Sequence, residues 1–342
     1  MADIKNLKVD LKNKILSCDK VIILPHKDPD FDALGSAAGL SFLANKLRKD
    51  FCSSIVVDIP RHDDAKMMLE DMKGNGYGYN IISVDEYLDN YYEITRDDLV
   101  ILTDVNAYSR IPISIDGVKK ENIIVIDHHE KSKDFVQSKI RFIDCKSSSA
   151  SEIVTKLLCQ FNIKYKSDLA NYLLAGIYLD TDRLKRIVDG DDKSYPDTLD
   201  IVSKLKKKHK ASPSEINKYF MKDFAVDRKV HRFIDGAQFT DTYGIIVGRD
   251  EEFFQKEELA MAADYLLPFT KGAAFTVGRV SEEFVSVSAR AKENSSINIS
   301  KVMQKLGGGG SKKSAAAMIS DATTEEVGKR LVKVLHPSFV EN

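Results

Sequence analysis

The chain has 342 residues, of which 43% are hydrophobic and 30% charged, and this composition excludes general disorder. Its length predicts about two domains at roughly 150 residues each. The 51 basic and 52 acidic residues leave a formal net charge of −1, which argues against a sequence-independent coat for long nucleic acid. A short nucleotide remains compatible with this balance, because one pocket can be basic in a neutral protein.

The cysteine pattern and the apolar segments indicate a cytoplasmic protein. None of the four cysteines forms a CxxC pair, so we expect reduced thiols rather than disulfides or a zinc knuckle. No apolar segment approaches the roughly 20 residues of a membrane span. Residues 1–14 are too highly charged for a signal peptide. We therefore expect no membrane partner.

Short apolar runs alternate with amphipathic stretches in the first half of the chain. The runs predict buried strands at 20–25, 54–59, 99–104, 123–127 and 139–143. Apolar residues three and four positions apart predict helices at 36–47, 151–161 and 168–179. This alternation predicts an α/β fold with a mostly parallel sheet and helices on both faces.

The composition changes near residue 187, where a polar breaker and a basic helical end precede Pro213. We predict domains at 1–186 and 214–342, joined by a linker at 187–213 that contains one helix and a solvated lysine run. The second domain is predicted to be a smaller α/β unit. Its predicted helices are 213–233, 257–267, 297–306, one beginning near Lys312, and 323–335, and its predicted strands are 243–248, 273–280 and 283–290.

Four polar clusters follow apolar elements in the first domain, at the sheet edge where ligands bind in open α/β folds. Each cluster taken singly also fits a turn or a helix cap. Together their imidazoles and carboxylates suit borderline-to-hard divalent cations such as manganese. A site for two such ions needs about this inventory, including a bridging carboxylate. The clusters are His26 with Asp30 and Asp32, then Asp104, then Asp127-His128-His129, and then Asp180.

These clusters resemble, in order and spacing, the motifs of the DHH family of phosphoesterases. Ser147–Glu152 is also similar to the serine-rich helix start that follows the DHH triplet in that family. The resemblance implies a hydrolase with two divalent metal ions, most readily Mn²⁺. It implies that Asp104 bridges the two ions. His26 and Asp30 would bind one ion, and the other ion would be bound by Asp32, His128 and Asp180.

The same resemblance implies the catalytic roles. A hydroxide shared by the two metals attacks the phosphate. His129 lies beside the scissile phosphate and either polarises it or protonates the leaving oxygen, and Asp127 orients the loop that carries the two histidines. Asp104 acts through both metals.

The C-terminal half resembles the DHH-associated domain that binds the nucleotide end of the substrate. The matching stretches are 288–290, 297–299 and 307–310, and they are most similar to the catalytic module of cyclic-di-AMP phosphodiesterases. The implied substrate-binding residues are Ser288, Arg290, Gly308, Gly309, Gly310 and Ser311. From the residues alone, four glycines before a predicted helix offer backbone N–H groups to an anion, and a flexible linker is the alternative. Ser311 departs from the histidine that the family usually has at this position.

The predicted function is hydrolysis of cyclic-di-AMP or of short linear dinucleotides such as pApA, with the substrate in a cleft between the domains. Two alternatives stay open. One is oligoribonuclease or phosphoadenosine-phosphate phosphatase activity on the same architecture. The other is nucleotide binding with weak turnover, which the Ser311 departure allows. A homodimer is compatible with the sequence.

Overall fold

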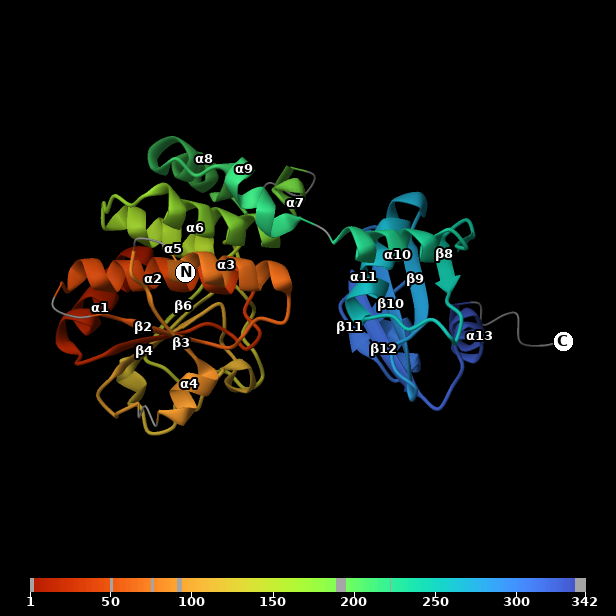
Figure 1. The fold of residues 1–342 in the computed structure, drawn as a ribbon, viewed down its shortest axis with the longest axis horizontal. Coiled ribbons are helices and arrows are strands. Elements are labelled where there is room, and N and C mark those ends of the chain that lie inside the picture. The colour runs from red at the N-terminus through yellow and green to blue at the C-terminus, as the bar shows by residue number, and fades with distance from the viewer. Residues whose placement is uncertain are drawn as a thin grey trace. The chain divides into compact units, whose positions relative to one another are not determined.

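The structure is a computed structural model that describes residues 3–49, 52–74, 77–90, 94–188, 195–221 and 223–335. The chain divides into two compact units, Met1–Met221 and Lys222–Asn342. Each unit is built on its own six-stranded sheet (Figure 1).

The sheet of the first unit is parallel throughout, in the order β3-β2-β1-β4-β5-β6. The strand order turns back between β1 and β4, and this reversal point is where open α/β sheets bind ligands. The strands are β1 Val21–Leu24, β2 Ser54–Val57, β3 Asn80–Ser83, β4 Leu99–Thr103, β5 Ile123–Asp127 and β6 Ile140–Ile143.

Most helices of this unit cover one face of the sheet. In Figure 1, α2, α3, α5 and α6 lie above the strands and α4 lies below them. The lower face is completed by apolar residues of the 105–118 segment, which pack against alternate residues of β1, β4 and β5. The helices are α1 Ile4–Ser17, α2 Phe31–Leu47, α3 Asp63–Gly74, α4 Val84–Asp89, α5 Ala150–Gln160, α6 Ser167–Asp180, α7 Lys185–Val188, α8 Thr198–His209 and α9 Pro213–Ile216, with 3₁₀ turns η1 Tyr108–Arg110, η2 Lys120–Asn122 and η3 Asn217–Phe220. The predicted fold class is confirmed.

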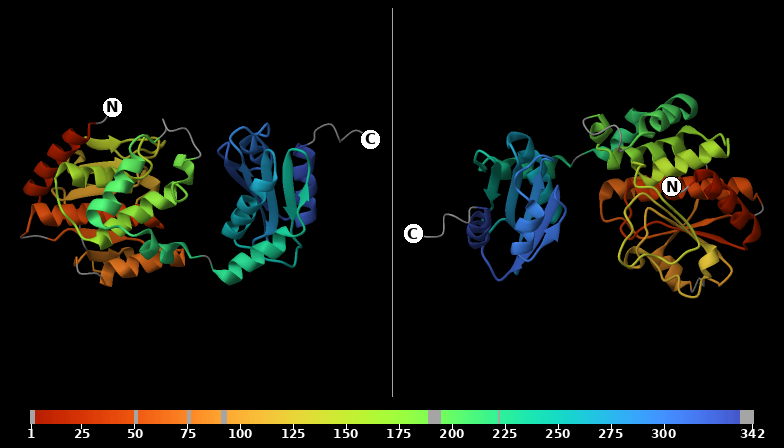
Figure 2. Two further views of the ribbon diagram at one scale, coloured as in Figure 1. Left: turned by 90° about the horizontal axis from the view of Figure 1, so that it is seen from above. Right: turned by 180° about the vertical axis from the view of Figure 1, so that it is seen from behind.

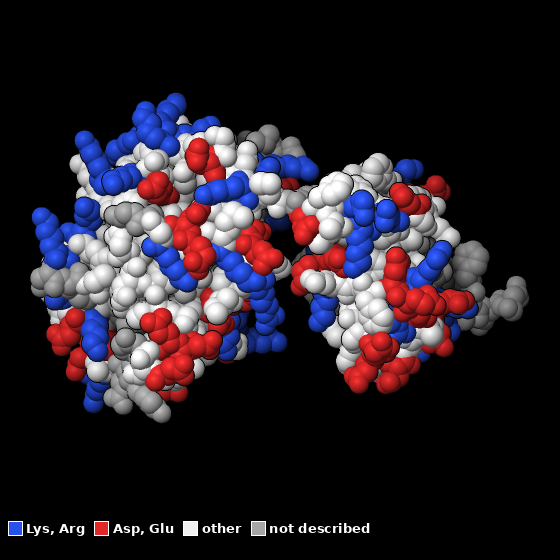
Figure 3. Space-filling model, viewed as in Figure 1, with Lys and Arg blue, Asp and Glu red and all other residues white. Residues whose placement is uncertain are grey.

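Helix α8 lies in the range that the sequence analysis assigned to a linker. Its apolar stripe, Ile201, Val202 and Leu205, is buried in the same core as α2, α5 and α6. The first compact unit therefore continues to Met221 rather than ending at residue 186. The lysines at 206–208 and 210 are exposed on the opposite side, and basic side chains gather over α8 in Figure 3. The predicted polar breaker at 189–193 lies outside the described residues.

The second unit has a mixed sheet in the order β11-β12-β10-β9-β8-β7. Helices α10 and α11 pack on one face and α12 and α13 on the other (Figure 2). Strands β9 and β10 pair antiparallel, as the predicted hairpin requires. The elements are α10 Phe224–Ile234, β7 Gln238–Phe239, β8 Tyr243–Val247, α11 Lys256–Leu266, η4 Leu267–Phe269, β9 Ala273–Arg279, β10 Phe284–Ala291, α12 Ile299–Lys305, β11 Gly309–Gly310, β12 Ser314–Ser320 and α13 Thr324–Leu335.

The predicted helix near Lys312 is wrong, because residues 314–320 form strand β12. Ala315 and Ala317 are buried while the residues beside them are exposed, and this two-residue period belongs to a strand. Gly308 and Gly310 allow the chain before β12 to lie against it. A Cβ at Gly308 would lie 2.1 Å from the Ala316 carbonyl oxygen, and one at Gly310 would lie 2.5 Å from the Ala315 Cα. The glycines therefore serve backbone packing and precede no helix N-terminus.

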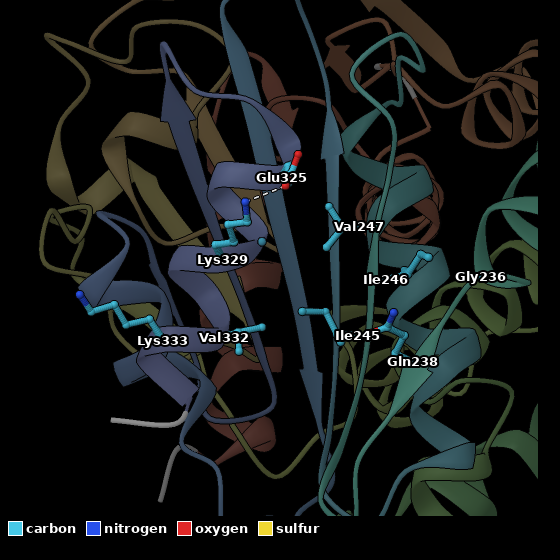
Figure 4. A pocket seen from close by; sticks show the side chains of 10 residues that line it. Gly236, Gln238, Ile245, Ile246, Val247, Glu325, Lys329, Val332 and Lys333 are labelled. Atoms are coloured by element: carbon cyan, nitrogen blue, oxygen red, sulfur yellow. Dashed lines mark ion pairs between the residues drawn. The ribbon is translucent and has the colours of Figure 1, made fainter. Parts of the chain in front are cut away.

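A second feature of this unit is a cavity of about 640 Å³ between α13 and the β7–β8 edge (Figure 4). Ile245, Val247 and Val332 give it apolar walls, and Glu325 pairs with Lys329 at its rim at 2.7 Å. None of the residues predicted to carry chemistry lines this cavity. Within the described part of the chain, no helix is long and apolar enough to span a membrane.

Candidate functional site

The four predicted clusters converge at the C-terminal edge of the first sheet. His26 follows β1, Asp104 follows β4, and His128 follows β5. Asp30 and Asp32 lie at the start of α2, and Asp180 is the last residue of α6. Side chains far apart in the sequence thus meet beside the reversal of the strand order, as the sequence predicted.

Asp104 lies between two histidines, with one oxygen toward each. Its Oδ2 is 3.4 Å from His26 Nε2, and its Oδ1 is 3.4 Å from His128 Nε2. Asp104 has a backbone φ of +56°, a conformation that Asp tolerates better than most residues. This placement is the one that a carboxylate bridging two cations requires.

Two of the three groups of potential ligand atoms found among the described residues form around these contacts. In the first, His26 Nε2 lies 3.8 Å from Asp30 Oδ2. In the second, His128 Nε2 lies 3.3 Å from Asp180 Oδ2 and 3.8 Å from Asp32 Oδ2. The ligand atoms within each group all lie within 4.8 Å of one another. The first group is the ligand set predicted for one ion, and the second is the set predicted for the other ion without Asp104. The third group is Asp104, Asp127, His128 and His129.

Several of these atoms are buried without a hydrogen-bond partner. Among the described residues, Asp104 Oδ1, His128 Nε2 and Asp180 Oδ2 have none, although each lies within 3.4 Å of another member of the cluster. An unpaired buried polar atom is costly. Atoms that point to a common centre without bonding to each other are what a cation needs, so the residues fit a divalent metal.

The protonation of the cluster also reflects an excess of negative charge. Burial and the neighbouring carboxylates Asp32 and Asp104 raise the pKa of Asp180 to about 9. Burial opposes protonation of His128, but Asp104, Asp32 and Asp180 outweigh it and raise its pKa to about 10. Burial likewise disfavours the charged form of Asp104, yet its contacts with the two histidines hold its pKa below the usual value. Without a metal, protons supply the positive charge of the site.

Asp30 serves two purposes at the start of α2. Its Oδ1 accepts hydrogen bonds from the backbone N–H groups of Asp32 and Ala33, at 2.9 and 3.1 Å, and so caps the helix. Its Oδ2 faces His26. The helix-cap interpretation and the ligand interpretation of this motif are therefore compatible. His26 Nδ1 lies 2.7 Å from the Lys27 carbonyl oxygen, so donation there leaves Nε2 for a metal.

The N-terminus of α5 holds Asp32, a contact that the sequence analysis missed. The backbone N–H groups of Ala150 and Ser151 each donate to one Asp32 oxygen at 2.7 Å. Asp32 is fully buried, and burial and the Asp104 charge raise its pKa to about 7. Gly176 of α6 permits this packing, because a Cβ there would lie 2.3 Å from Ser151 Oγ and 2.8 Å from Asp32 Oδ1. The serine-rich stretch after the DHH triplet was the only sequence signal for this contact.

The two adjacent histidines point to different partners. His128 faces the carboxylate cluster, whereas His129 is 49% exposed and its Nδ1 lies 2.9 Å from Asp127 Oδ1. His129 Nδ1 also lies 3.4 Å from Asp104 Oδ1. Asp127 is buried, and the same Oδ1 accepts the backbone N–H groups of His128 and His129. The geometry separates one inward-facing ring from one ring that can meet a substrate.

In the second unit, five of the six predicted substrate-binding residues line a cavity of about 520 Å³ on the α11 side of β10. They are Ser288, Arg290, Gly308, Gly309 and Gly310. Arg290 Nε donates to Asp264 Oδ1 at 2.9 Å. Lys256 and Glu257 of α11 also line this cavity, and no sequence motif indicated them.

Ser311 occupies the β11–β12 turn and is not among the residues that line this cavity. Its Oγ accepts the backbone N–H groups of Lys313 and Ser314 at 3.2 and 3.1 Å. Its own N–H donates to the Ser314 carbonyl oxygen at 2.7 Å. These contacts give the side chain a role in the turn.

Comparison with protein families identifies both units. The model described as "DHH family, N-terminal domain" matches residues 20–177, and the "DHHA1 domain" model matches residues 242–339. The chain therefore contains a DHH domain and a DHHA1 domain. The His26–Asp180 cluster lies in and directly after the matched part of the DHH domain. All residues that line the 520 Å³ cavity lie within the DHHA1 match.

Curated relatives share most of the chain. Cyclic-di-AMP phosphodiesterase GdpP of Geobacillus thermodenitrificans is 31% identical over 337 residues, which cover 96% of this chain and 49% of the relative. Cyclic-di-AMP phosphodiesterase PdeA of Listeria monocytogenes is 27% identical over 343 residues, which cover 95% of this chain and 48% of the relative. The chain thus spans about half the length of these relatives.

Solved structures support the fold. An exopolyphosphatase-related protein from Bacteroides fragilis is similar with a TM-score of 0.77 and 20% identity, covering 97% of this chain and 96% of that protein. RecJ of Thermus thermophilus, solved in complex with Mn²⁺, has a TM-score of 0.53 and 14% identity, covering 99% of this chain and 55% of RecJ.

Proposed function

We propose that the chain is a divalent-metal-dependent phosphodiesterase that hydrolyses cyclic-di-AMP or short linear dinucleotides such as pApA. The observation that carries the proposal is the cluster around Asp104, in which buried, unpaired nitrogen and oxygen atoms converge. Relatives named as cyclic-di-AMP phosphodiesterases support the substrate class. RecJ, which shares the fold and was solved with Mn²⁺, supports the choice of metal.

Two ions would be held by the two ligand groups. His26, Asp30 and Asp104 would hold one of them. The second would use Asp104 with the other group, which is Asp32, His128 and Asp180. When bound, such ions polarise phosphoryl oxygens and lower the pKa of water toward neutrality.

The protein's own groups would supply orientation and proton transfer. Asp127 holds the His129 ring through Nδ1 and leaves Nε2 for the leaving oxygen of the substrate. The α5 N-terminus keeps Asp32 in place through two backbone donors. In the DHHA1 domain, Arg290, Lys256 and the glycine backbone would bind the nucleotide, with Ser288 on the same wall of the cavity.

The test is a hydrolysis panel with the Mn²⁺-loaded chain on cyclic-di-AMP, pApA and phosphoadenosine phosphate, with products resolved by length. We expect turnover of the first two that EDTA abolishes and that Asp104→Asn, which keeps the shape of the side chain, lacks. If phosphoadenosine phosphate is hydrolysed in preference to the dinucleotides, the alternative phosphatase activity replaces the proposed one. Nucleotide binding without hydrolysis in the metal-loaded chain would refute the enzymatic proposal.

A further inference from the structure

Asn106 lies two residues after Asp104 and is 4% exposed. Its Nδ2 donates to Asp127 Oδ2 at 2.6 Å and to the Glu130 carbonyl oxygen at 3.1 Å. Its Oδ1 accepts the Ser132 N–H at 3.0 Å. Because Nδ2 faces two acceptors and Oδ1 faces a donor, the orientation of the Asn106 amide is defined. The loop after β4 is thereby joined to the loop after β5.

Asp127 is held from both of its oxygens. Its Oδ1 takes the backbone N–H groups of His128 and His129, at 2.8 and 3.1 Å, and the His129 ring at 2.9 Å. Its Oδ2 takes the Asn106 amide. Asn106 therefore supplies a side-chain donor to Oδ2, while the His129 ring and two backbone N–H groups bind Oδ1.

The orientation of Asp127 determines which nitrogen of His129 faces outward. A neutral imidazole carries one N–H, and donation from Nδ1 to Asp127 leaves Nε2 as the exposed nitrogen. Without an anchored carboxylate, both tautomers and other ring orientations become accessible. To protonate the leaving oxygen, the ring must carry a proton on both nitrogens; it gives up the Nε2 proton and remains as the neutral tautomer with the Nδ1 proton that Asp127 holds.

We propose that Asn106 is a positioning residue that fixes the tautomer and orientation of His129 through Asp127. Its kinetic consequence rests on the proposed phosphodiesterase function, but its structural consequence does not. The hydrogen bonds of the Asn106 side chain go to Asp127, Glu130 and Ser132, none of which is a predicted metal ligand.

The structural test is ¹⁵N–¹H NMR of the imidazole rings in the EDTA-treated full chain, with the His129 signals identified by their absence in His129→Gln. In the wild type we expect a single tautomer with the proton on Nδ1. Asn106→Ala should give averaged signals from both tautomers, whereas the control Ser132→Ala, which keeps its backbone N–H, should match the wild type. An unchanged His129 tautomer in Asn106→Ala would overturn the proposal.

The kinetic test is a double-mutant cycle in the Mn²⁺-loaded chain. We expect Asn106→Ala to lower kcat by about 10- to 100-fold, with KM and bound Mn²⁺ within about threefold of the wild type. In a His129→Ala background the same substitution should have almost no further effect, because its partner is already gone. Additive losses in the two backgrounds, or a parallel loss of bound Mn²⁺, would show that Asn106 acts on Asp104 or on folding instead.

Asn106→Asp separates positioning from packing, because it keeps the shape but places two carboxylates 2.6 Å apart. We expect it to lower kcat at least as much as Asn106→Ala, and wild-type kcat in this variant would contradict the proposal. If the wild-type chain hydrolyses none of the nucleotides, the proposed function fails, and the NMR comparison still decides whether Asn106 positions His129.

Discussion

In the absence of bound metal, the free energy of unfolding of the DHH domain should fall as pH rises. His26 and His128 both have a pKa of about 10 in the folded, metal-free chain, because the surrounding carboxylates outweigh the effect of burial. The pKa of Asp180 is raised to about 9. An unfolded chain would release these protons near pH values of about 6.5 and about 4. The folded state thus binds more protons, and stability falls as pH rises toward the folded pKa values.

The magnitude follows from linkage. Each proton retained only by the folded state contributes about 1.4 kcal/mol per pH unit. Each such proton gives about 3 kcal/mol of lost stability between pH 7 and pH 9, so about 3 kcal/mol, from one net proton for the whole cluster, is the smallest loss expected. Bound Mn²⁺ requires deprotonated ligands, so this slope should disappear in the metal-loaded protein, and metal binding should release protons.

The assay is urea unfolding at several pH values between 7 and 9, with EDTA or with saturating Mn²⁺, monitored by hydrogen exchange in α2 and α5. His26→Gln is the matched control, because it removes one titrating ring and should flatten the metal-free slope. Metal-free stability that is constant or rises over this range would refute the reasoning.

Three further predictions concern single residues. Asp104→Asn should reduce bound Mn²⁺ at both positions, measured by elemental analysis, and retention of one full equivalent would argue against a bridging role. His128→Ala should lower Mn²⁺ affinity, whereas His129→Ala should keep the metal and slow hydrolysis by about 10²–10⁴-fold; equal metal loss in both would contradict the separation of roles. Arg290→Ala should raise KM for the nucleotide. Ser311→Ala should leave KM within about threefold of the wild type and lower the stability of the DHHA1 domain by about 1 kcal/mol. A larger effect of Ser311→Ala on KM would place this residue at the substrate.

The sequence was sufficient to predict the parallel sheet and the convergence of the ligand cluster. Apolar runs such as 99–103 and 123–127 became strands with nearly the predicted bounds. Polar residues that follow parallel strands share one sheet edge, so their convergence could be predicted from the sequence. The bridging position of Asp104 was implied by the resemblance to the DHH family.

Other features depended on contacts that the sequence does not display. A helix was predicted to begin near Lys312, although pairing with β10 makes residues 314–320 a strand. Helix α8 was placed in a linker because its lysines dominate the local composition, although its apolar stripe packs on the first core. Asn106 could not be found from spacing alone, since its partner Asp127 is 21 positions away.

The most direct test of the proposed function is one titration of Mn²⁺ into the EDTA-treated chain with cyclic-di-AMP present, measuring bound metal and product together. The cluster predicts that the hydrolysis rate rises with metal binding and saturates near two ions per chain, and that Asp104→Asn shows neither response. Saturable Mn²⁺ binding at these ligands with no cleavage of cyclic-di-AMP or pApA would contradict it.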